Sequence, residues 1–277
     1  MSDAPAGLPP PYQHLKTVSR SAIGQTWIVR DTRHPKDSFR IIQKLDISSN
    51  EPSLVEFGQI LLSHKAQTLQ TLFKETASSH KIYGYFSEEQ SFYVVQPMIK
   101  GKSLHRLRDL DQWSIVSVLT DILLMLQQVY SWGLGSCCLH PNDLIQCQSD
   151  KGWVWTGTGI FKTIVHQVSK QTLPLTELFP KDTAAYFAPE FLQGRFDMGS
   201  DLYTVGVSLI QALTQLPLKE LVYGDSGYFV IRRSWYRQKQ LPDVLVELLT
   251  RMVNPNPLKR YSTITAVLNE LDKLPAS

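Results

Sequence analysis

The chain has little cysteine, little net charge and no long hydrophobic run. Only 3 of its 277 residues are cysteine, and two of these, Cys137 and Cys138, are adjacent. So few thiols do not make a disulfide framework and favour a reducing, cytoplasmic location. No run of 18 apolar residues occurs, and the proline-rich start, residues 4–11, is unlike a signal peptide, so we expect no membrane insertion. A net charge of only +3 gives no reason to expect a nucleic-acid partner.

The apolar content is 43%, which excludes an intrinsically disordered chain. A chain of this length can bury most of the surface that its unfolded form exposes, so one large domain or two joined lobes is expected. Residues 1–11 are rich in proline, glycine and alanine and predict a flexible tail.

The spacing of apolar residues in the sequence changes near Pro97. Before it, short β-branched and aromatic runs predict strands at 26–29 and 39–42, with a turn at 34–37, and a hairpin of 81–86 with 91–95. A helix is predicted at 51–73, with one side formed by Leu61, Lys65, Thr68, Leu69 and Leu72. After Pro97, apolar residues recur at helical spacing over 115–130, 202–213, 241–252 and 264–271. The sequence therefore predicts an α+β fold with a small β-rich lobe, residues 12–96, and a larger helical lobe, residues 97–277.

Three motifs occur in a fixed order in the second half. They are Tyr186-Phe-Ala-Pro-Glu190, Ser200-Asp201-Leu-Tyr-Thr-Val-Gly206 and Asn256-Pro-Leu-Lys-Arg260-Tyr-Ser262. With the order of elements, they resemble the bacterial Hanks-type Ser/Thr protein kinase family, over about residues 12–274. The resemblance implies a two-lobed kinase fold, a buried ion pair between Glu190 and Arg260, and a structural role for Asp201.

The same resemblance locates the positions that would grip a nucleotide in the first lobe. The glycine-rich loop falls on residues 19–24 and keeps only Gly24 of three glycines. The strand lysine falls on Gln43, and the helix glutamate that should pair with it falls on Lys65. Lys44 cannot simply substitute, because adjacent strand residues face opposite ways. A bound nucleotide would be expected to meet Gly24, Ile41, Gln43, Lys44, Met98, Ile99 and Asp143.

In the second lobe, the resemblance places the catalytic loop at Ser136–Ile145. The catalytic aspartate position is Cys138, the loop lysine position is His140, and the metal-binding asparagine position is Asp143. A thiol near its ordinary pKa is a poor substitute for a carboxylate base. The metal-binding aspartate of the next motif falls on Gly157, which has no side chain to hold Mg²⁺.

The leading interpretation is a catalytically inactive kinase-like domain, a pseudokinase, that binds or regulates another protein without a cofactor. In support, Ser136 and Thr158 occupy positions where a histidine and a phenylalanine would stack beneath Leu69. One alternative is an unorthodox ATP- and Mg²⁺-dependent Ser/Thr kinase or other nucleotide-dependent transferase that uses Asp143, Lys44 or Lys65. Another is binding of nucleic acid or an acidic partner through residues 232–239, between Arg232 and Lys239, which mix cations and aromatic rings.

Some residue types suggest further chemistry that the pattern does not favour. Cys137, Cys138, His140 and Cys147 are all residue types that bind zinc, but vicinal cysteines do not easily face one tetrahedral ion, so buried packing is favoured. Asp143 is predicted to cap or to be solvated rather than to hold a metal alone. Thr183 matches the threonine of the family's substrate loop, and without a catalytic aspartate its expected role is structural.

Overall fold

In a computed structural model of the chain, the structure describes residues 8–34, 36, 38–74, 81–108, 110–133, 135–169, 184–221 and 241–274. They group by contacts into two compact units. The first contains the described residues up to Lys100 and those from Ile160 to residue 169. The second contains Gly101–Gly159 and the described residues from 184 onward. The break thus falls a few residues after the predicted boundary at 96/97, and the return of residues 160–169 to the first unit was not predicted.

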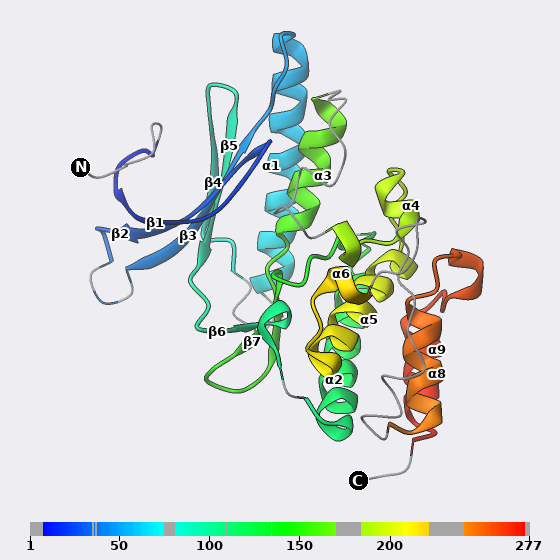
Figure 1. The fold of residues 1–277 in the computed structure, drawn as a ribbon. Coiled ribbons are helices and arrows are strands. Elements are labelled where there is room, and N and C mark those ends of the chain that lie inside the picture. The colour runs from blue at the N-terminus through cyan, green and yellow to red at the C-terminus, as the bar shows by residue number, and fades with distance from the viewer. Residues whose placement is uncertain are drawn as a thin grey trace. The chain divides into compact units, whose positions relative to one another are not determined.

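The first unit is built on a five-stranded antiparallel sheet with the order β1-β2-β3-β5-β4. Its strands are β1 (Tyr12–Ser21), β2 (Gly24–Asp31), β3 (Phe39–Asp46), β4 (Gly84–Glu88) and β5 (Ser91–Pro97). Helix α1 (Pro52–Lys74) and the unit's part of helix α3 (Thr158–Val168) lie on the same side of this sheet (Figure 1). The strands predicted at 26–29, 39–42 and 91–95 and the predicted helix are confirmed. The strand predicted at 81–86 runs instead over Gly84–Glu88, and β1 and α3 are additional.

The two faces of the sheet bury different residues because side chains alternate along each strand. One face carries a hydrophobic cluster of Trp27, Val29, Ile42, Tyr93 and Val95. The opposite face carries Gln43 and Leu45 of β3 beside their cross-strand neighbours Val94 and Phe92. We call this second face the inner face. It is the face on which Phe92 contacts Phe161 of α3, with ring centroids 6.5 Å apart.

The buried residues of α1 only partly coincide with the side that the sequence pattern picked out. Leu62, Ala66, Leu69 and Phe73 are almost fully buried, whereas Leu61 is 37% exposed. Of the residues on that side, Leu69 is thus buried and Leu61 is exposed. Leu61 and Leu62 are equally apolar, so hydrophobic periodicity could not separate them, and the buried side is marked instead by small residues, Gly58 and Ala66.

The predicted flexible tail ends earlier than Pro11. The Thr32 hydroxyl and backbone N–H both donate to the Pro11 carbonyl oxygen, at 3.0 and 3.2 Å. Leu8 packs against the Trp27 cluster. Residues 8–11 are therefore attached to the sheet because Leu8, which the tail prediction ignored, is an apolar side chain that can be buried; residues 1–7 lie outside the described residues.

The second unit combines a small antiparallel sheet with helices that surround α5. The sheet has the order β6-β7-β8, formed by Gly101–Ser103, Leu144–Cys147 and Trp153–Trp155. The helices are η1 (Leu104–Arg106), α2 (Gln112–Ser131), η3 (Ala184–Tyr186), α4 (Pro189–Leu192), α5 (Met198–Thr214), α6 (Leu218–Leu221), α8 (Asp243–Met252), η4 (Pro257–Lys259) and α9 (Ile264–Leu271). All four predicted helices of this region are present, as α2, α5, α8 and α9.

Helix α2 is the one described helix long and apolar enough, by length and composition, to cross a membrane, over Trp113–Ser131. It contacts α5, α9 and β8 within the second unit. The Asp111 side chain caps its start by accepting a 2.7 Å hydrogen bond from the Ser114 backbone N–H. This packing against helices and a strand accounts for its apolar composition.

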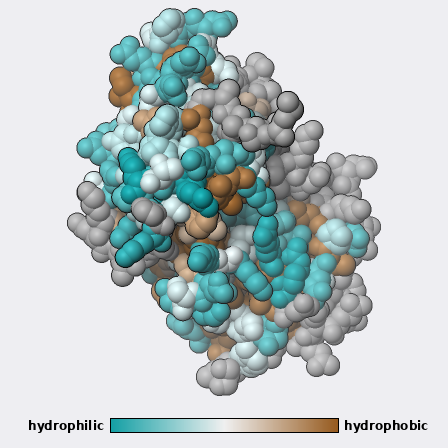
Figure 2. All heavy atoms as spheres, turned by 90° about the vertical axis from the view of Figure 1, so that its left-hand side faces the viewer, coloured by the Kyte–Doolittle hydropathy of each residue, from teal (hydrophilic) through white to brown (hydrophobic). Residues whose placement is uncertain are grey.

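Helix α5 is the centre of the second unit. From Ser200 to Leu213 all of its residues are buried, and it contacts η1, η3, α2 and α8. The face of the molecule drawn in Figure 2 is mainly hydrophilic, and its coloured hydrophobic residues appear in small separate areas. The buried residues of α5 are therefore the centre of the packing in the second unit.

Candidate functional site: the loop at residues 136–143

The loop between α2 and β7, residues 136–143, is held by Asp201 of α5. One carboxylate oxygen, Oδ2, accepts hydrogen bonds from the Cys137 backbone N–H at 2.7 Å, from Tyr130 Oη at 2.5 Å and from Ser136 Oγ at 3.1 Å. The other oxygen, Oδ1, accepts from the Leu139 N–H at 2.9 Å. Asp201 thus fixes the backbone of the loop, which is the structural role that the resemblance implied.

Burial changes the pKa values of the groups around Asp201. Asp201 is 2% exposed, and burial raises its carboxyl pKa above the usual value although four hydrogen bonds oppose the rise. Burial, with the negative charge of Asp201, also raises the pKa of the Tyr130 hydroxyl. The Cys137 thiol has its pKa raised by burial and then by Asp201 and Cys138, so it stays protonated and unreactive at neutral pH.

Cys138, at the catalytic aspartate position, is 3% exposed. Its backbone φ of 49° lies in the left-handed region, which is uncommon for a residue with a side chain. Its Sγ lies 3.9 Å from Ser136 Oγ and its backbone N–H donates to the same oxygen at 3.2 Å. The thiol therefore packs within the loop, and a buried thiol is a weak proton acceptor.

His140, at the loop lysine position, is also buried, with 3% exposure. Its Nδ1 accepts a hydrogen bond from the Asn142 backbone N–H at 3.1 Å, which requires an unprotonated Nδ1 and places the proton of the neutral ring on Nε2. The ring contacts Tyr186 and Phe187, with centroids 6.0 Å away in both cases. A neutral, packed imidazole replaces the mobile cation that would approach a phosphate.

Asp143, at the position of the metal-binding asparagine, is 7% exposed and bonded to two threonines. Its Oδ1 accepts from Thr158 Oγ1 at 2.5 Å and from Thr156 Oγ1 at 3.4 Å, and its backbone carbonyl accepts from the Thr156 N–H at 2.9 Å. Gly157 lies between these threonines with φ of 73°, a conformation that L side chains rarely adopt. Asp143 therefore ties down the chain just before α3 through these two threonine hydroxyls.

Gly159, the third residue of the Gly157-Thr158-Gly159 turn, packs against the loop at residues 136–143. A Cβ at Gly159 would stand 2.1 Å from the Cys138 carbonyl oxygen, so no larger residue fits there. Ser136 and Thr158, which replace the stacking histidine and phenylalanine of the family, donate instead to Asp201 and Asp143. The sequence pattern located these residues, but it did not reveal that their hydroxyls donate to the two buried carboxylates.

In the first unit, the inner face presents Gln43 where the family has its lysine. Gln43 is 1% exposed, and neither atom of its amide group has a hydrogen-bond partner. Lys44 faces the opposite side of the sheet beside Tyr93 and pairs with Asp46 at 2.9 Å. Burial opposes the charge of Lys44, but the Asp46 carboxylate outweighs it and raises the lysine pKa. Lys44 therefore lies on the face opposite Gln43, as the alternation of side chains along a strand predicts.

The remaining positions expected to contact a nucleotide are a glycine required by close packing and four half-buried side chains. A Cβ at Gly24, which has φ of 149°, would stand 2.0 Å from the Lys44 carbonyl oxygen, so close strand packing alone requires this glycine. Ile41, Lys65, Met98 and Ile99 are half-buried. Among the residues of the first unit that the structure describes, no lysine and glutamate are paired at these positions in the way that orients a triphosphate.

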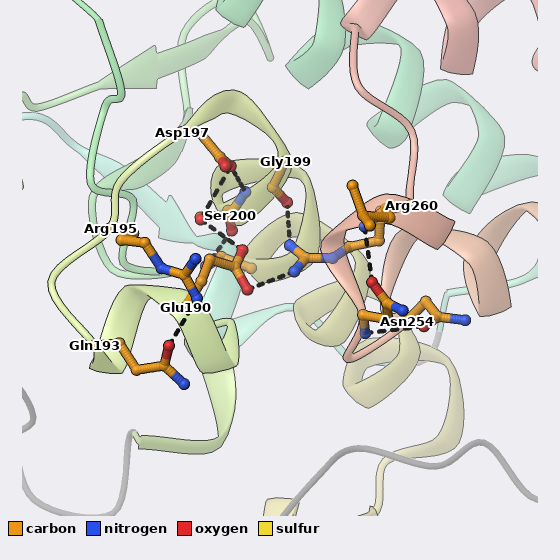
Figure 3. Close-up of polar contacts among 11 residues, drawn as sticks. Glu190, Gln193, Arg195, Asp197, Gly199, Ser200, Asn254 and Arg260 are labelled. Carbon is orange, nitrogen blue, oxygen red and sulfur yellow. Dashed lines mark hydrogen bonds and ion pairs between the residues drawn. The ribbon is translucent and has the colours of Figure 1, made fainter.

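The predicted ion pair of the second unit is present. Arg260 Nη2 lies 2.5 Å from Glu190 Oε2, and both side chains are at most 3% exposed (Figure 3). Arg260 Nη1 also donates to the Gly199 carbonyl at 2.9 Å, and Ser200 Oγ donates to Glu190 Oε1 at 2.8 Å. Burial works to raise the pKa of Glu190, but the hydrogen bonds from Arg260 and Ser200 outweigh it and keep the pKa low.

The cysteines show burial rather than a ligand arrangement. Cys137, Cys138 and Cys147 are free thiols and buried. Within the described ranges, no group of three or more histidine, cysteine, aspartate or glutamate side chains is placed to hold a metal ion. Thr183 and residues 232–239 lie outside the described residues, so the predictions for them remain predictions.

Comparison with known proteins identifies the fold. No family model matches the chain. The chain is 26% identical over 269 residues to serine/threonine-protein kinase D of Synechocystis sp., covering 96% of this chain and 52% of the relative. It is 24% identical over 265 residues to serine/threonine-protein kinase PknA of Nostoc sp., covering 94% and 46%. The chain thus spans about half the length of these curated relatives.

The solved structures agree. The chain superposes on the kinase domain of Mycobacterium tuberculosis PknI with a TM-score of 0.61 at 14% identity, covering 95% of each chain. The fold is therefore that of a protein-kinase domain, with a β-sheet lobe followed by a larger helical lobe, and the relatives are bacterial Ser/Thr protein kinases.

Proposed function

We propose that this chain is a pseudokinase: a kinase-like domain that does not transfer phosphate and acts as a protein-binding or regulatory module. The observation that carries the proposal is the state of the Gln43 position. A neutral amide is buried there without a partner, and the neighbouring Lys44 is paired with Asp46 on the other face. Charge stabilisation is usually the largest catalytic contribution in phosphoryl transfer, and this position supplies none.

The loop of the second unit supports the same proposal. The base position holds a buried thiol, and Gly157 offers no ligand for Mg²⁺. Asp143, the one carboxylate left at a metal-binding position, accepts hydrogen bonds from Thr156 and Thr158. Losing the general base alone costs roughly 10²–10⁴-fold in rate. In contrast, Glu190, Asp201 and Arg260 keep the contacts that maintain a kinase fold.

Thermal melting with and without ATP and Mg²⁺ tests the proposal. A ligand at 100 times its dissociation constant stabilises a protein by about 2.7 kcal/mol. We expect no shift in Tm at millimolar ATP with Mg²⁺, whereas a kinase domain with all catalytic residues, melted alongside, shifts by several degrees. A shift of that size in this chain contradicts the absence of a nucleotide site.

A phosphate-transfer assay separates binding from turnover. We expect no radiolabel transferred to the chain itself or to a general acceptor protein, and the same background for Asp143→Ala. Turnover that Asp143→Ala abolishes would establish the alternative, an unorthodox transferase with relocated residues.

The binding role is tested by capture of partners from the native cell followed by mass spectrometry. Recovery of no specific protein counts against that role.

A further inference from the structure

Residues 101–108 carry a concentration of positive charge beside the loop at residues 136–143. Lys102 of β6, Arg106 of η1 and Arg108 shortly after η1 are exposed, whereas His105 is half-buried. The stretch contains no aspartate or glutamate, although the chain as a whole has a net charge of only +3. We call Lys102, His105, Arg106 and Arg108 the basic surface. Its positive charge is therefore a local feature of the molecule.

The fold of the second unit holds the basic surface in place. Leu104 and Leu107 are only 1% and 8% exposed, and η1 packs against α5 and β7, so these two side chains anchor the segment. Arg108 Nη1 donates to the carbonyl oxygens of His105 and Leu107, both at 2.6 Å, which fixes the guanidinium at the end of η1. A surface that is ordered before binding loses less conformational entropy when a partner binds.

The charge of the basic surface is not neutralised within the part of the chain that the structure describes. No carboxylate there forms an ion pair with Lys102, Arg106 or Arg108. The effect reaches His105, whose pKa is lowered by burial and then by the positive charges of Arg108 and Arg106. An anionic partner supplies the missing opposite charge, whereas a cationic partner is repelled.

Strand β6, which carries Lys102, offers a second feature, a strand edge. In the sheet order β6-β7-β8 it pairs with β7 on one side, and no strand among the described residues pairs with its other side (Figure 1). The Ser103 hydroxyl donates to Asn142 Oδ1 at 3.2 Å, which ties this strand to the loop at residues 136–143. An edge strand is a template to which an extended peptide can add through main-chain hydrogen bonds.

We propose that the basic surface and the outer edge of β6 together bind an acidic, extended segment of a partner protein. Side chains alternate along an added strand, so carboxylates at every second position face the same side and can pair with the cations. Nucleic acid is disfavoured, because bases bind by stacking on exposed rings and Tyr186, the ring in contact with His105, is fully buried. The inference rests on the proposed binding role and names the chemistry of the partner.

Fluorescence anisotropy of the full chain with a labelled peptide of alternating glutamate and threonine tests the proposal. At low salt we expect saturable binding, and the same peptide with lysine in place of glutamate should not bind. Lys102→Glu and Arg106→Glu should each weaken the affinity by about fivefold or more, because an attraction becomes a repulsion. Lys259→Glu is the matched control, since it changes an exposed lysine of η4 in the same unit; it should stay within about twofold of the wild type.

Backbone methylation of the peptide tests the strand pairing separately from the charge. One peptide is N-methylated at its glutamates and a second at its threonines. Only every second N–H of an added strand points toward its neighbour, so one of the two peptides should lose binding and the other should keep it. Equal affinities of the two methylated peptides overturn the pairing with β6.

Three further results overturn the proposal. They are no binding of the acidic peptide, equal effects of Lys102→Glu and Lys259→Glu, and a single-stranded oligouridylate that binds at least as tightly as the peptide. Both lysines are exposed, so the variants should fold, and circular dichroism checks this. If the peptide fails while ATP gives no shift in Tm, this inference alone is wrong; a shift with ATP or phosphate transfer contradicts the proposed function whatever the peptide does.

Discussion

Several positions that match the kinase family by sequence hold residues with different chemistry from the family's. Gln43 occupies the place of a lysine, and its amide is buried without hydrogen-bond partners. A buried unsatisfied polar group costs about 1–3 kcal/mol, so this residue lowers the stability of the first unit. Gly24 and Gly159 keep the family's glycines, and for both the close approach of a backbone carbonyl oxygen is a sufficient reason.

Replacing the orphaned amide should therefore stabilise the protein. We expect Gln43→Leu to raise the free energy of unfolding by about 1 kcal/mol, because a side chain of similar size then fills the same space without a desolvated amide. Urea denaturation followed by circular dichroism measures the change. Gln67→Leu, at an exposed position of α1, is the control and should stay within about 0.5 kcal/mol of the wild type. A clear loss of stability in Gln43→Leu would show that the amide has a partner in solution.

Between elements, the decisive link is the one from α5 to the loop at residues 136–143. Asp201 accepts four hydrogen bonds there, three of them on a single oxygen atom. The link holds the backbone of the loop although the loop's side chains differ from those at the matching positions of the family. The loop conformation thus depends on α5.

Asp201→Asn should break this link. An amide nitrogen placed at Oδ2 would face the donors of Tyr130, Ser136 and Cys137, and turning the amide only moves the conflict to the Leu139 N–H. We expect a loss of about 2–4 kcal/mol in the free energy of unfolding. Ser136→Ala, which removes one of the four donors, should cost only about 1 kcal/mol. Comparable losses in the two variants would argue against Asp201 as the organising group.

The elements differ in how well the sequence predicts them. Helices α2, α5, α8 and α9 were predictable because each has apolar residues at helical spacing, and Glu190–Arg260 followed from two recognisable motifs. Helix α3 has the same spacing, from Ile160 to Val168, but no helix was predicted there. The buried side of α1 could not be read from the sequence because glycine and alanine, which permit close approach, carry no hydrophobic signal.

For the whole molecule, stability depends on two buried carboxylates with opposite effects of pH. The pKa of Glu190 is lowered when the protein folds, so its contribution is complete above the unfolded pKa of about 4.3 and is lost as pH falls through the folded value. The pKa of Asp201 is raised, so protonation of this group as pH falls through its folded value favours the folded state.

The ion pair can be isolated by comparing the wild type with Glu190→Gln across pH. At pH 7 the variant should be less stable by about 3–5 kcal/mol, because Arg260 stays buried without its charge partner. Below about pH 4.3 the difference should shrink, since the wild type progressively loses the same charge, while Asp201 affects both proteins equally. Urea titrations at pH 7, 4 and 3 measure it, and a difference that stays the same down to pH 3 would mean that the charge of Glu190 does not make this contribution in the folded protein.

The close contact between Gly58 of α1 and Val168 of α3, where a Cβ would stand 2.9 Å from Val168 Cγ1, also has a consequence for biosynthesis. Helix α1 and Val168 are separated by roughly 100 residues of sequence, and translation adds about 5–20 residues per second. Helix α1 therefore leaves the ribosome on the order of ten seconds before the residue that packs on it. During that interval the buried side of α1 around Gly58 lacks its contact with α3.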